Sequence, residues 1–413
     1  MTTPYKYHYK CIDCNRTYEA GQVLYLCPHC AAGNTDDKPP KGVLKTVYDY
    51  KAIKESVSGF LSLQKQGFLN LLPIDKPESL PNLKVGQTPF YKINRLNNKN
   101  LPFHLYLKDD GQNPTFSFKD RASALVSAFA KEHNLNTIVA ASTGNAGSSL
   151  AGICASQHQK AVIMVPQAAP LAKLTQIMMY GATIVPVAGS YDDAFDLSIE
   201  ATKAYGWYNR NTAFNPITIE GKKTVSFELF ADMQHQIPDR IFVPVGDGVI
   251  ISGVYKGFED LLNLGIIDKM PVIVAVQSKG SDNLVRNLDR HPFEIKTSRT
   301  LADSISVDIP RNFYMAQHYL KTYHGEWLTV TDDEIMEASS VLAKNTGIFS
   351  EPAAATAFAG LLHYQLSGKL TDGSGNVVLL TGSGLKDIGT VSSRLKMPEA
   401  IKPDLHELEK LLP

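Results

Sequence analysis

Hydrophobic positions after residue 103 follow two alternating patterns. Short runs of nearly continuous, often β-branched apolar residues predict buried strands, and these runs occupy 137–142, 160–166, 183–189, 240–246, 271–277 and 376–382. Segments with apolar residues at helical spacing separate the runs and predict helices at 148–158, 171–181, 191–206, 253–265 and 332–347. Alternation of this kind is typical of parallel sheets covered by helices on both faces, so we expect an α/β fold.

The residues before this region are patterned differently. Short alternating segments at 5–10, 22–27 and 43–50 predict the hairpins of a small ribbon, which could not hold a hydrophobic core by itself. Residues 51–80 predict one or two helices, and residues 402–413 predict a terminal helix.

Four of the five cysteines lie within 20 residues of one another as C-x2-C-x12-C-x2-C, at Cys11, Cys14, Cys27 and Cys30. Two such turns aim four thiolates at one tetrahedral Zn²⁺ ion. A pair of disulfides is the alternative, which a reducing cytosol disfavours. Four thiolates leave no open coordination position, so we expect a structural zinc on which the ribbon depends. Cys154 lies at helical spacing and is expected to be a small buried hydrophobe.

Composition narrows the function classes. The 413 residues include 41 basic and 41 acidic side chains, and this neutrality disfavours nucleic acid as the main partner. No apolar stretch approaches the roughly 20 residues needed to span a bilayer, and residues 1–11 lack the apolar region of a secretory signal. We therefore expect a cytoplasmic, multi-domain enzyme that does not act on a membrane.

Three turns follow predicted strands and precede helical patterns, where ligands bind in parallel sheets. The turn at 142–147 (STGNAG) and the turn at 246–248 (GDG) are rich in small residues. Each exposes backbone N–H groups at a helix start, where a carboxylate or phosphate binds. The third turn, 382–384, follows the hydroxyl of Thr381. Together the turns indicate a ligand with a phosphate and a second anionic group.

Lys119 is the candidate nucleophile. It follows Pro114, Phe116 and Phe118 and lies at or near the first turn of a predicted helix. A cation at this end opposes the helix dipole, and aromatic neighbours also favour the neutral amine, the form that makes a Schiff base. A solvated surface lysine is the alternative interpretation.

The segment NPTFSFKDR around Lys119 resembles the lysine motif of pyridoxal-phosphate enzymes of the tryptophan-synthase-β-like fold, and threonine synthases most of all. Further segments resemble these enzymes in the same order, namely KVGQTPF at 84–90, STGNAG at 142–147, NPITIEGKKT at 215–224, GIFSEPAAATAFAG at 347–360 and LTGSGLKD at 380–387. An N-terminal cysteine ribbon also occurs in one branch of threonine synthases.

The resemblance implies a homodimer of chains with two α/β domains. We expect a zinc ribbon at 1–50, a large cofactor-binding domain at 51–129 and 231–413, and a small α/β domain at 130–230.

The resemblance also implies roles for individual residues. Lys119 would hold pyridoxal phosphate, Asn145 would bond its phenolic oxygen, and Thr381 would face its pyridine nitrogen. The cofactor phosphate would lie in the turn formed by Gly246, Asp247, Gly248, Val249 and Ile250. The substrate carboxylate would bind the N–H groups of Ser142, Thr143, Gly144, Asn145 and Ala146.

The implied reaction is that of a carbon–oxygen lyase. It converts O-phospho-L-homoserine and water to L-threonine and phosphate by γ-elimination and β-addition, with Lys119 as the mobile base. The leaving phosphate needs hydrogen-bond donors, and the candidates by sequence are Lys108, Arg210, Thr212, Asn215, Lys222 and Lys223.

Two positions depart from the family pattern, and the charge of a third residue would oppose cofactor binding. Thr218 stands where related threonine synthases usually carry an arginine suited to bidentate phosphate recognition. Lys222 stands where a glutamine is more usual and would supply a point charge. The carboxylate of Asp247 would repel a phosphate unless it turns away and caps a local turn.

Two alternatives therefore stay open. One is another pyridoxal-phosphate-dependent replacement or elimination, either cysteate-synthase-like or an ammonia-lyase acting on serine, threonine or a diamino acid. The other is a non-catalytic pyridoxal-phosphate carrier that uses its ribbon for partner contacts.

Overall fold

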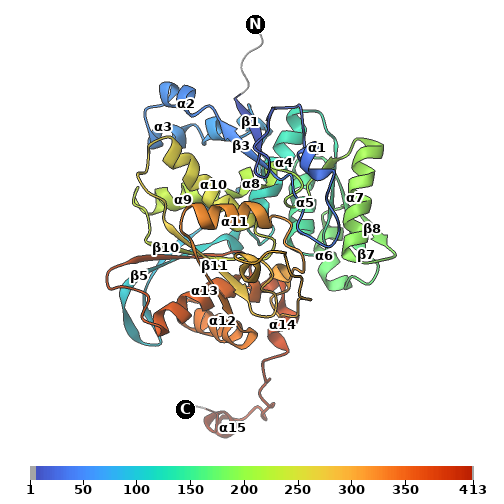
Figure 1. Ribbon diagram of the computed structural model, residues 1–413. Helices are drawn as coiled ribbons and strands as arrows, with labels where there is room; N and C mark the ends of the chain where they lie inside the picture. Colours follow the sequence, from blue (N-terminus) through green and yellow to red (C-terminus); the bar gives the residue numbers. More distant parts are fainter. Residues whose placement is uncertain (1–5, 412–413) are drawn as a thin grey trace.

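The computed structural model describes residues 6–411. Residue 5 of the predicted strand at 5–10, the N-terminal residues 1–4 and residues 412–413 of the predicted terminal helix lie outside the described residues. Its strands form three sheets, with the orders β2-β1-β3, β8-β7-β6-β9 and β12-β11-β10-β13-β5-β4 (Figure 1). Helices cover the two larger sheets, and the α/β fold class predicted from the hydrophobic pattern is confirmed.

The N-terminal sheet is antiparallel and consists of β1 (Tyr7–Cys11), β2 (Thr17–Glu19) and β3 (Leu44–Tyr48). The strand expected at 22–27 is absent from this sheet, and that prediction was wrong. The segment docks on the α/β body instead, because Tyr25 stacks on Phe214 and its hydroxyl accepts a hydrogen bond from the backbone N–H of Asn209.

The six-stranded sheet is parallel except at one edge, where β4 runs antiparallel to β5. Its strands are β4 (Phe90–Leu96), β5 (Lys99–Asp109), β10 (Arg240–Pro244), β11 (Val272–Ser278), β12 (Glu326–Val330) and β13 (Gly375–Leu380). The hydrophobic pattern found β10, β11 and β13. It missed β5 and the edge strands β4 and β12, because each includes exposed positions and lacks a continuous apolar run.

The four-stranded sheet is entirely parallel. It contains β6 (Thr137–Ala141), β7 (Lys160–Pro166), β8 (Thr183–Val187) and β9 (Tyr208–Asn209). All its strands fall between residues 130 and 230, and the domain boundaries at 50, 129 and 230 stay a prediction.

The helices connect the strands as expected of βαβ units. They are α1 (Pro28–Ala31), α2 (Tyr50–Ser56), α3 (Phe60–Lys65), α4 (Lys119–Glu132), α5 (Asn145–Ser156), α6 (Leu171–Met179), α7 (Tyr191–Tyr205), α8 (Ile217–Lys222), α9 (Thr224–Asp232), α10 (Val249–Asn263), α11 (Phe313–Thr322), α12 (Asp332–Thr346), α13 (Pro352–Leu366), α14 (Ile388–Ser392) and α15 (Leu405–Glu409). Two of them, α7 and α12, begin at capping boxes, which fixes where the chain leaves the preceding strand.

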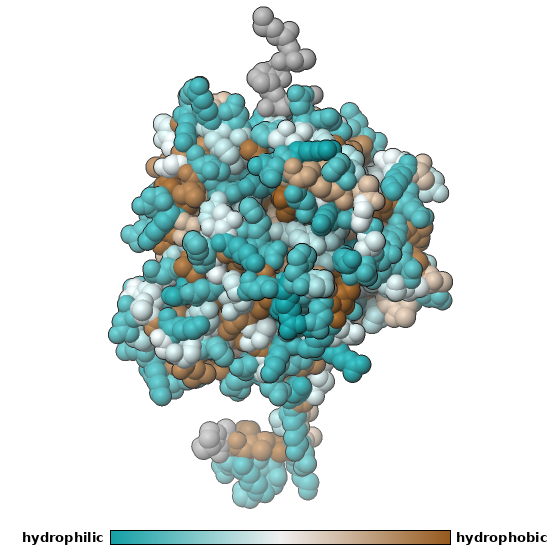
Figure 2. Space-filling model, viewed as in Figure 1, coloured by the Kyte–Doolittle hydropathy of each residue, from teal (hydrophilic) through white to brown (hydrophobic). Residues whose placement is uncertain are grey.

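The core forms on both faces of the six-stranded sheet. On one face, α10 and α11 pack with the ribbon strands, while α12 and α13 cover the other face (Figure 1). Among the described residues no helix is long and apolar enough to cross a membrane. The face shown in Figure 2 is mostly hydrophilic, with hydrophobic residues in scattered groups.

The ribbon is joined to the α/β body by buried polar contacts as well as by apolar packing. The hydroxyl of Tyr48 donates to Glu220 over 2.6 Å, and that of Tyr50 donates to Asp260 over 2.6 Å. Lys45 pairs with Glu259 at 2.7 Å. These contacts place β3 directly on α8 and α10.

Candidate active site

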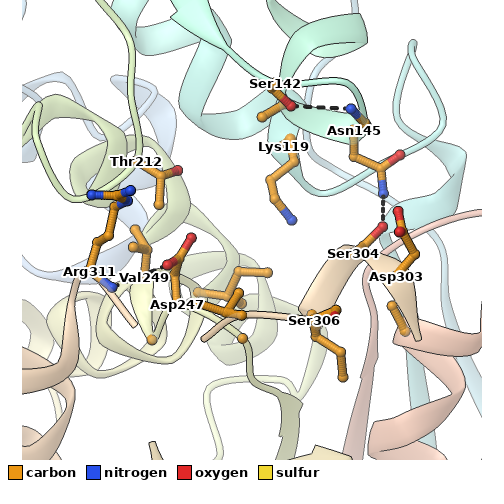
Figure 3. Close-up of a pocket in the computed structure, with 18 of the residues that line it drawn as sticks. Lys119, Ser142, Asn145, Thr212, Asp247, Val249, Asp303, Ser304, Ser306 and Arg311 are labelled. Atoms are coloured by element: carbon orange, nitrogen blue, oxygen red, sulfur yellow. Dashed lines mark hydrogen bonds between the residues drawn. The ribbon is translucent and has the colours of Figure 1, made fainter. Parts of the chain in front are cut away.

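A cavity of about 550 Å³ lies where the carboxyl ends of β6, β10 and β13 meet the start of α4 (Figure 3). The turns after β10 and β13 meet here because these strands are parallel neighbours in one sheet and present their carboxyl ends at the same edge. The turn after β6 brings the carboxyl edge of the four-stranded sheet to the same cavity. The lining includes Lys119, the loop 142–146, the turn 246–250 and Thr381.

Lys119 is the first residue of α4, and its side chain points into the cavity (Figure 3). The preceding segment is held in place because the N–H of Phe118 donates to the carbonyl of Thr381 over 2.9 Å and Ser117 pairs with Gly382. Burial lowers the pKa of the Lys119 amine; the carboxylate of Glu351 opposes this shift. The amine therefore loses its proton more readily than that of a surface lysine, which suits a base or a nucleophile.

The segment 142–146 runs from the end of β6 into α5. Asn145 is the first residue of α5, so this helix starts three residues earlier than the predicted start at 148. The first N–H groups of a helix have no intrahelical acceptor, and residues 142–146 line the cavity. A Cβ at Gly147 would come within 2.4 Å of the Ser142 carbonyl, so this close turn requires glycine. The side-chain amide of Asn145 donates to Glu351 over 3.0 Å and to Ser304 over 3.2 Å, which fixes its orientation.

The turn 246–250 brings bare backbone to the cavity at the start of α10. Gly248 has φ +86°, and a Cβ at Gly246 would come within 2.9 Å of the backbone of Ile305. The side-chain carboxylate of Asp247 accepts a hydrogen bond from the backbone N–H of Arg311 over 3.1 Å. The backbone carbonyl of Asp247 accepts one from the backbone N–H of Asn312. The side chain therefore holds the segment at 310–312 rather than capping its own turn.

Two cations line the cavity from the side of the smaller sheet. Arg210 follows β9, and Lys222 is the last residue of α8. Both are buried, and neither Arg210 Nη2 nor Lys222 Nζ has a hydrogen-bond partner in the described part of the chain. Thr212 lines the same side and accepts a 3.4 Å hydrogen bond from Arg210.

Three residues predicted to bind the substrate do not line the cavity. Lys108 bonds to Asp232 and the Thr88 carbonyl, each at 2.8 Å. Asn215 donates to the carbonyl of Asn209 over 2.7 Å.

Lys223, the third of these residues, lies in a buried ion-pair network with Glu220 and Asp260. Neighbours on a helix point about 100° apart, so Lys222 faces the cavity while Lys223 faces the ribbon. The structure thus corrects these three assignments.

The cavity also has residues that the sequence reasoning missed. They are Tyr191, Asp303, Ser304, Ser306, Arg311 and Glu351. Residues 303–311 belong to a segment whose hydrophobic residues follow neither helical nor strand spacing. The sequence pattern therefore did not predict that they line the cavity. Glu351 lies in the GIFSEPAAA segment that resembles the family, and that segment was the available signal. Burial raises the pKa of its carboxyl, and the bond from Asn145 opposes the shift.

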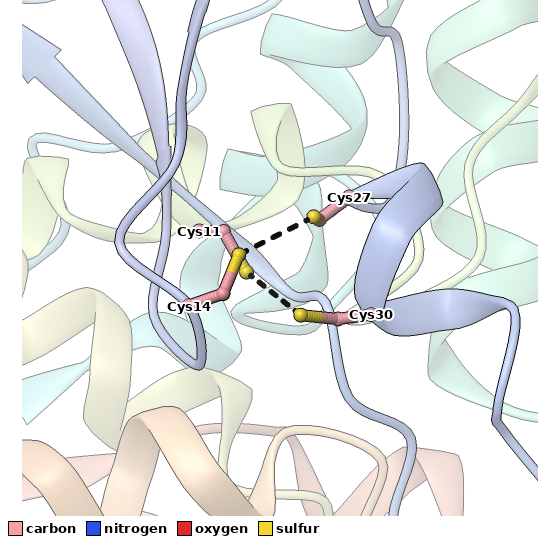
Figure 4. A group of neighbouring side chains, drawn as sticks. All are labelled: Cys11, Cys14, Cys27 and Cys30. Atoms are coloured by element: carbon pink, nitrogen blue, oxygen red, sulfur yellow. Dashed lines mark hydrogen bonds between the residues drawn. The ribbon is translucent and has the colours of Figure 1, made fainter.

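The four ribbon cysteines gather at one point (Figure 4). The sulfurs of Cys11 and Cys30 are 3.8 Å apart, as are those of Cys14 and Cys27, and all four lie within 4.8 Å of one another. Four sulfurs bound tetrahedrally at about 2.3 Å would be separated by about 3.8 Å. The cysteines are free thiols, which removes the disulfide alternative.

Comparison with known proteins defines the class. The sequence pattern of the family described as pyridoxal-phosphate dependent enzyme matches residues 82–382, which include Lys119, the loop 142–146, the turn 246–250 and Thr381. The chain therefore belongs to the pyridoxal-phosphate-dependent enzymes. Within them it belongs to the threonine synthase family, because it is 34% identical over 411 residues to "Threonine synthase" of Methanocaldococcus jannaschii, with 98% of each chain covered.

Other comparisons agree with this assignment. The chain is 32% identical to "Threonine synthase" of Methanosarcina acetivorans, again over 98% of each chain. Among solved structures it resembles serine racemase from Dictyostelium discoideum, with a TM-score of 0.60 and 25% identity over 72% of this chain and 92% of that one.

The cavity residues fit pyridoxal phosphate. Lys119 presents an amine of lowered pKa, and the turn 246–250 offers glycines that leave no room for a Cβ, as a phosphate cradle requires. Unpaired cations in the same cavity suit a ligand that carries phosphate.

Proposed function

We propose that this cavity carries out the threonine synthase reaction, in which O-phospho-L-homoserine and water give L-threonine and phosphate. The observation that supports it most directly is a lysine of lowered pKa placed between two helix N-termini, those of α5 and α10, within one cavity. One terminus suits the substrate carboxylate and the other suits the cofactor phosphate.

Pyridoxal phosphate, when bound, supplies an electron-accepting ring that stabilises negative charge at the substrate carbons. Lys119 would hold its aldehyde carbon, the N–H groups of 246–250 would hold its phosphate, and Asn145 would bond its phenolic oxygen. Thr381, a buried hydroxyl, would donate to an unprotonated pyridine nitrogen.

The chain's own residues then bind the substrate and move protons. The backbone N–H groups of Thr143, Asn145 and Ala146 would bind the substrate carboxylate and fix the α-carbon beside Lys119. The N–H of Ser142, also predicted for this role, instead donates to the Met164 carbonyl over 3.2 Å, and that of Gly144 donates to the Ser142 hydroxyl over 3.3 Å. The Lys119 amine takes the α-proton and then a β-proton, since one mobile base of lowered pKa can serve neighbouring carbons. Phosphate leaves from the γ-carbon, which gains a proton in its place. Water gives its hydroxyl to the β-carbon and its remaining proton to the released phosphate, and the α-carbon regains a proton from Lys119. Glu351 keeps Asn145 in position throughout through its hydrogen bond.

The ribbon would hold one structural Zn²⁺ through Cys11, Cys14, Cys27 and Cys30, as the sulfur separations support. The four thiolates complete the coordination, so this ion takes no part in the reaction. A homodimeric state and a cytoplasmic location remain predictions from the resemblance and the cysteine usage.

A different replacement or elimination on the same scaffold is the second candidate, and one observation favours it. Thr218 is buried, and its hydroxyl donates to the carbonyl of Asn215 over 2.7 Å, so it offers nothing to a substrate phosphate.

Purified protein with pyridoxal phosphate and O-phospho-L-homoserine should release phosphate and threonine in equal amounts. Lys119→Ala should abolish both products and the visible absorption of bound cofactor, while Lys203→Ala, an exposed lysine on α7, should match the unmodified protein. Ammonia from serine or threonine, with no phosphate from O-phospho-L-homoserine, would support the second candidate instead. Turnover retained by Lys119→Ala would refute the role of this lysine.

A further inference from the structure

Two buried cations in the cavity have unused hydrogen-bonding capacity. Lys222 is fully buried, and its Nζ has no hydrogen-bond partner among the described residues. Arg210 is 1% exposed; its Nε donates to Ser123 and its Nη1 to Thr212, while its Nη2 is without an acceptor within residues 6–411. An unpaired buried charge costs several kcal/mol, so such a pair persists where a ligand supplies the missing counter-charge.

The fold holds both side chains in place. Arg210 follows β9, and its backbone N–H donates to the Val139 carbonyl of the neighbouring strand over 2.8 Å. Lys222 ends α8 and packs against α10, where a Cβ on Gly253 would come within 2.6 Å of the Lys222 Cβ. Rigid placement of this kind is what a specific anion site requires.

The local charges favour an anion here. Burial lowers the pKa of Lys222 well below its usual value, the nearby charges of Arg210 and Lys119 lower it further, and the Asp247 carboxylate opposes these shifts. A bound anion beside Lys222 would favour its charged ammonium form. The acidic side chains that line the cavity have other partners. Asp247 accepts the N–H of Arg311, and Glu351 accepts the amide of Asn145. Arg311 pairs with Asp192, Lys173 pairs with Asp303, and Asp308 accepts the backbone N–H of Ser298.

We propose that Arg210 and Lys222 form the subsite for the phosphate dianion at the distal end of the substrate. Arginine offers the planar donor pair that phosphate accepts in bidentate fashion, and lysine adds a point charge. Arg210 and Lys222 together would bind the phosphate in place of the arginine that related enzymes usually carry at position 218. Thr218 cannot do so, because its hydroxyl donates to the carbonyl of Asn215. The proposal names the substrate class of the cavity described above and rests on the proposed function.

Phosphate in this cavity has two sources, the substrate and the cofactor, and the experiment separates them. In holoenzyme, Lys222→Gln and Arg210→Gln should each raise the KM for O-phospho-L-homoserine and the inhibition constant of inorganic phosphate by about tenfold to a hundredfold, the range for a hydrogen bond to a charged group. Binding of L-threonine, which lacks the phosphate, should change less than twofold. Lys203→Gln on α7 is the control for net charge.

A second arm measures the affinity of the chain for pyridoxal phosphate after the cofactor has been removed. We expect the two variants to bind it as the unmodified chain does, because the turn at 246–250 lies elsewhere in the cavity. A loss of cofactor affinity with unchanged KM would assign the cations to the cofactor phosphate and overturn the proposal.

Thermal unfolding distinguishes a binding role from a structural one. Without phosphate, Lys222→Gln should unfold at the same temperature as the unmodified protein or higher, because it removes an unpaired buried charge. Added inorganic phosphate should raise the unfolding temperature of the unmodified protein and not that of the variant. A variant that is less stable or fails to fold, or one still stabilised by phosphate, would overturn the proposal.

The outcomes for the two proposals remain separable. If O-phospho-L-homoserine is not turned over, the proposed function fails, yet dependence of inorganic phosphate binding on Arg210 and Lys222 would still support the subsite. If turnover occurs and both variants keep their KM, the subsite fails and the proposed function stands.

Discussion

Asp260 is the acidic centre of the buried network that joins the ribbon to α8 and α10. Its side chain is fully buried, accepts from Lys223 over 2.7 Å and from Tyr50 over 2.6 Å, and also pairs with Lys256. Burial lowers the pKa of Lys256, but Asp260, followed by Tyr50, Glu220 and Glu259, together outweigh burial and raise that pKa well above its usual value. We expect Asp260→Asn, which keeps the shape and removes the charge, to destabilise this junction strongly.

The loss of stability depends on which partners the ammonium groups of Lys223 and Lys256 retain in Asp260→Asn. Lys223 retains Glu220. Among the described contacts, Lys256 retains no carboxylate partner and keeps a cation–π contact with Tyr48 at 5.1 Å. Leaving one buried charge uncompensated costs about 3–5 kcal/mol, a large part of the 5–15 kcal/mol that is usual for a folded protein.

Urea unfolding followed by tyrosine fluorescence measures this loss. With a slope of about 3 kcal/mol per molar urea, the midpoint should fall by about 1 M or more. Asp268→Asn, at an exposed position on the same connection after α10, is the matched control and should shift the free energy by less than about 0.5 kcal/mol. Adding Lys256→Met to Asp260→Asn should restore most of the loss. A single variant as stable as the unmodified protein would refute this account of the network.

Two further perturbations test the ribbon and a second ion pair. Protein prepared without chelator should contain one zinc per chain, Cys30→Ser should lose it, and absence of stoichiometric metal would contradict the structural site. For Glu228, burial raises the pKa, but Arg121 and Lys108 outweigh burial and lower it from 4.5 to about 2. Its contribution to stability is therefore present above about pH 4.5 and lost as the pH falls toward 2. Glu228→Gln should make the urea midpoint less sensitive to pH in that range, and an unchanged pH dependence would contradict the pairing.

The hydrophobic pattern predicted the central strands of the six-stranded sheet that are buried along most of their length. Strands β10, β11 and β13 are buried on both faces and read as continuous apolar runs, and the turns that follow β10 and β13 meet at one cavity because parallel strands share an edge. The family motifs found Lys119 and also contained Glu351, to which no role had been assigned.

The sequence did not predict the direction in which individual side chains point. Lys222 and Lys223 are adjacent in the chain, yet one faces the cavity and the other faces Tyr48 at 4.1 Å, and no pattern of residue types separates them. The strand expected at 22–27 failed for a related reason, since the alternation there serves docking of Tyr25 on Phe214 rather than pairing. Tertiary contacts decided both cases.

During synthesis the ribbon leaves the ribosome long before α8 and α10, which carry the carboxylates that bind it. Lys45 and Tyr48 find their carboxylate partners 214 and 172 residues later in the chain. At about 5–20 residues per second of synthesis, these side chains wait roughly 10–40 s for α8 and α10 to appear. During that interval a Zn²⁺ ion held by the four thiolates, as proposed above, would be a local means of keeping the three short strands together. The proposed metal site would thus act in the nascent chain, before an active site exists.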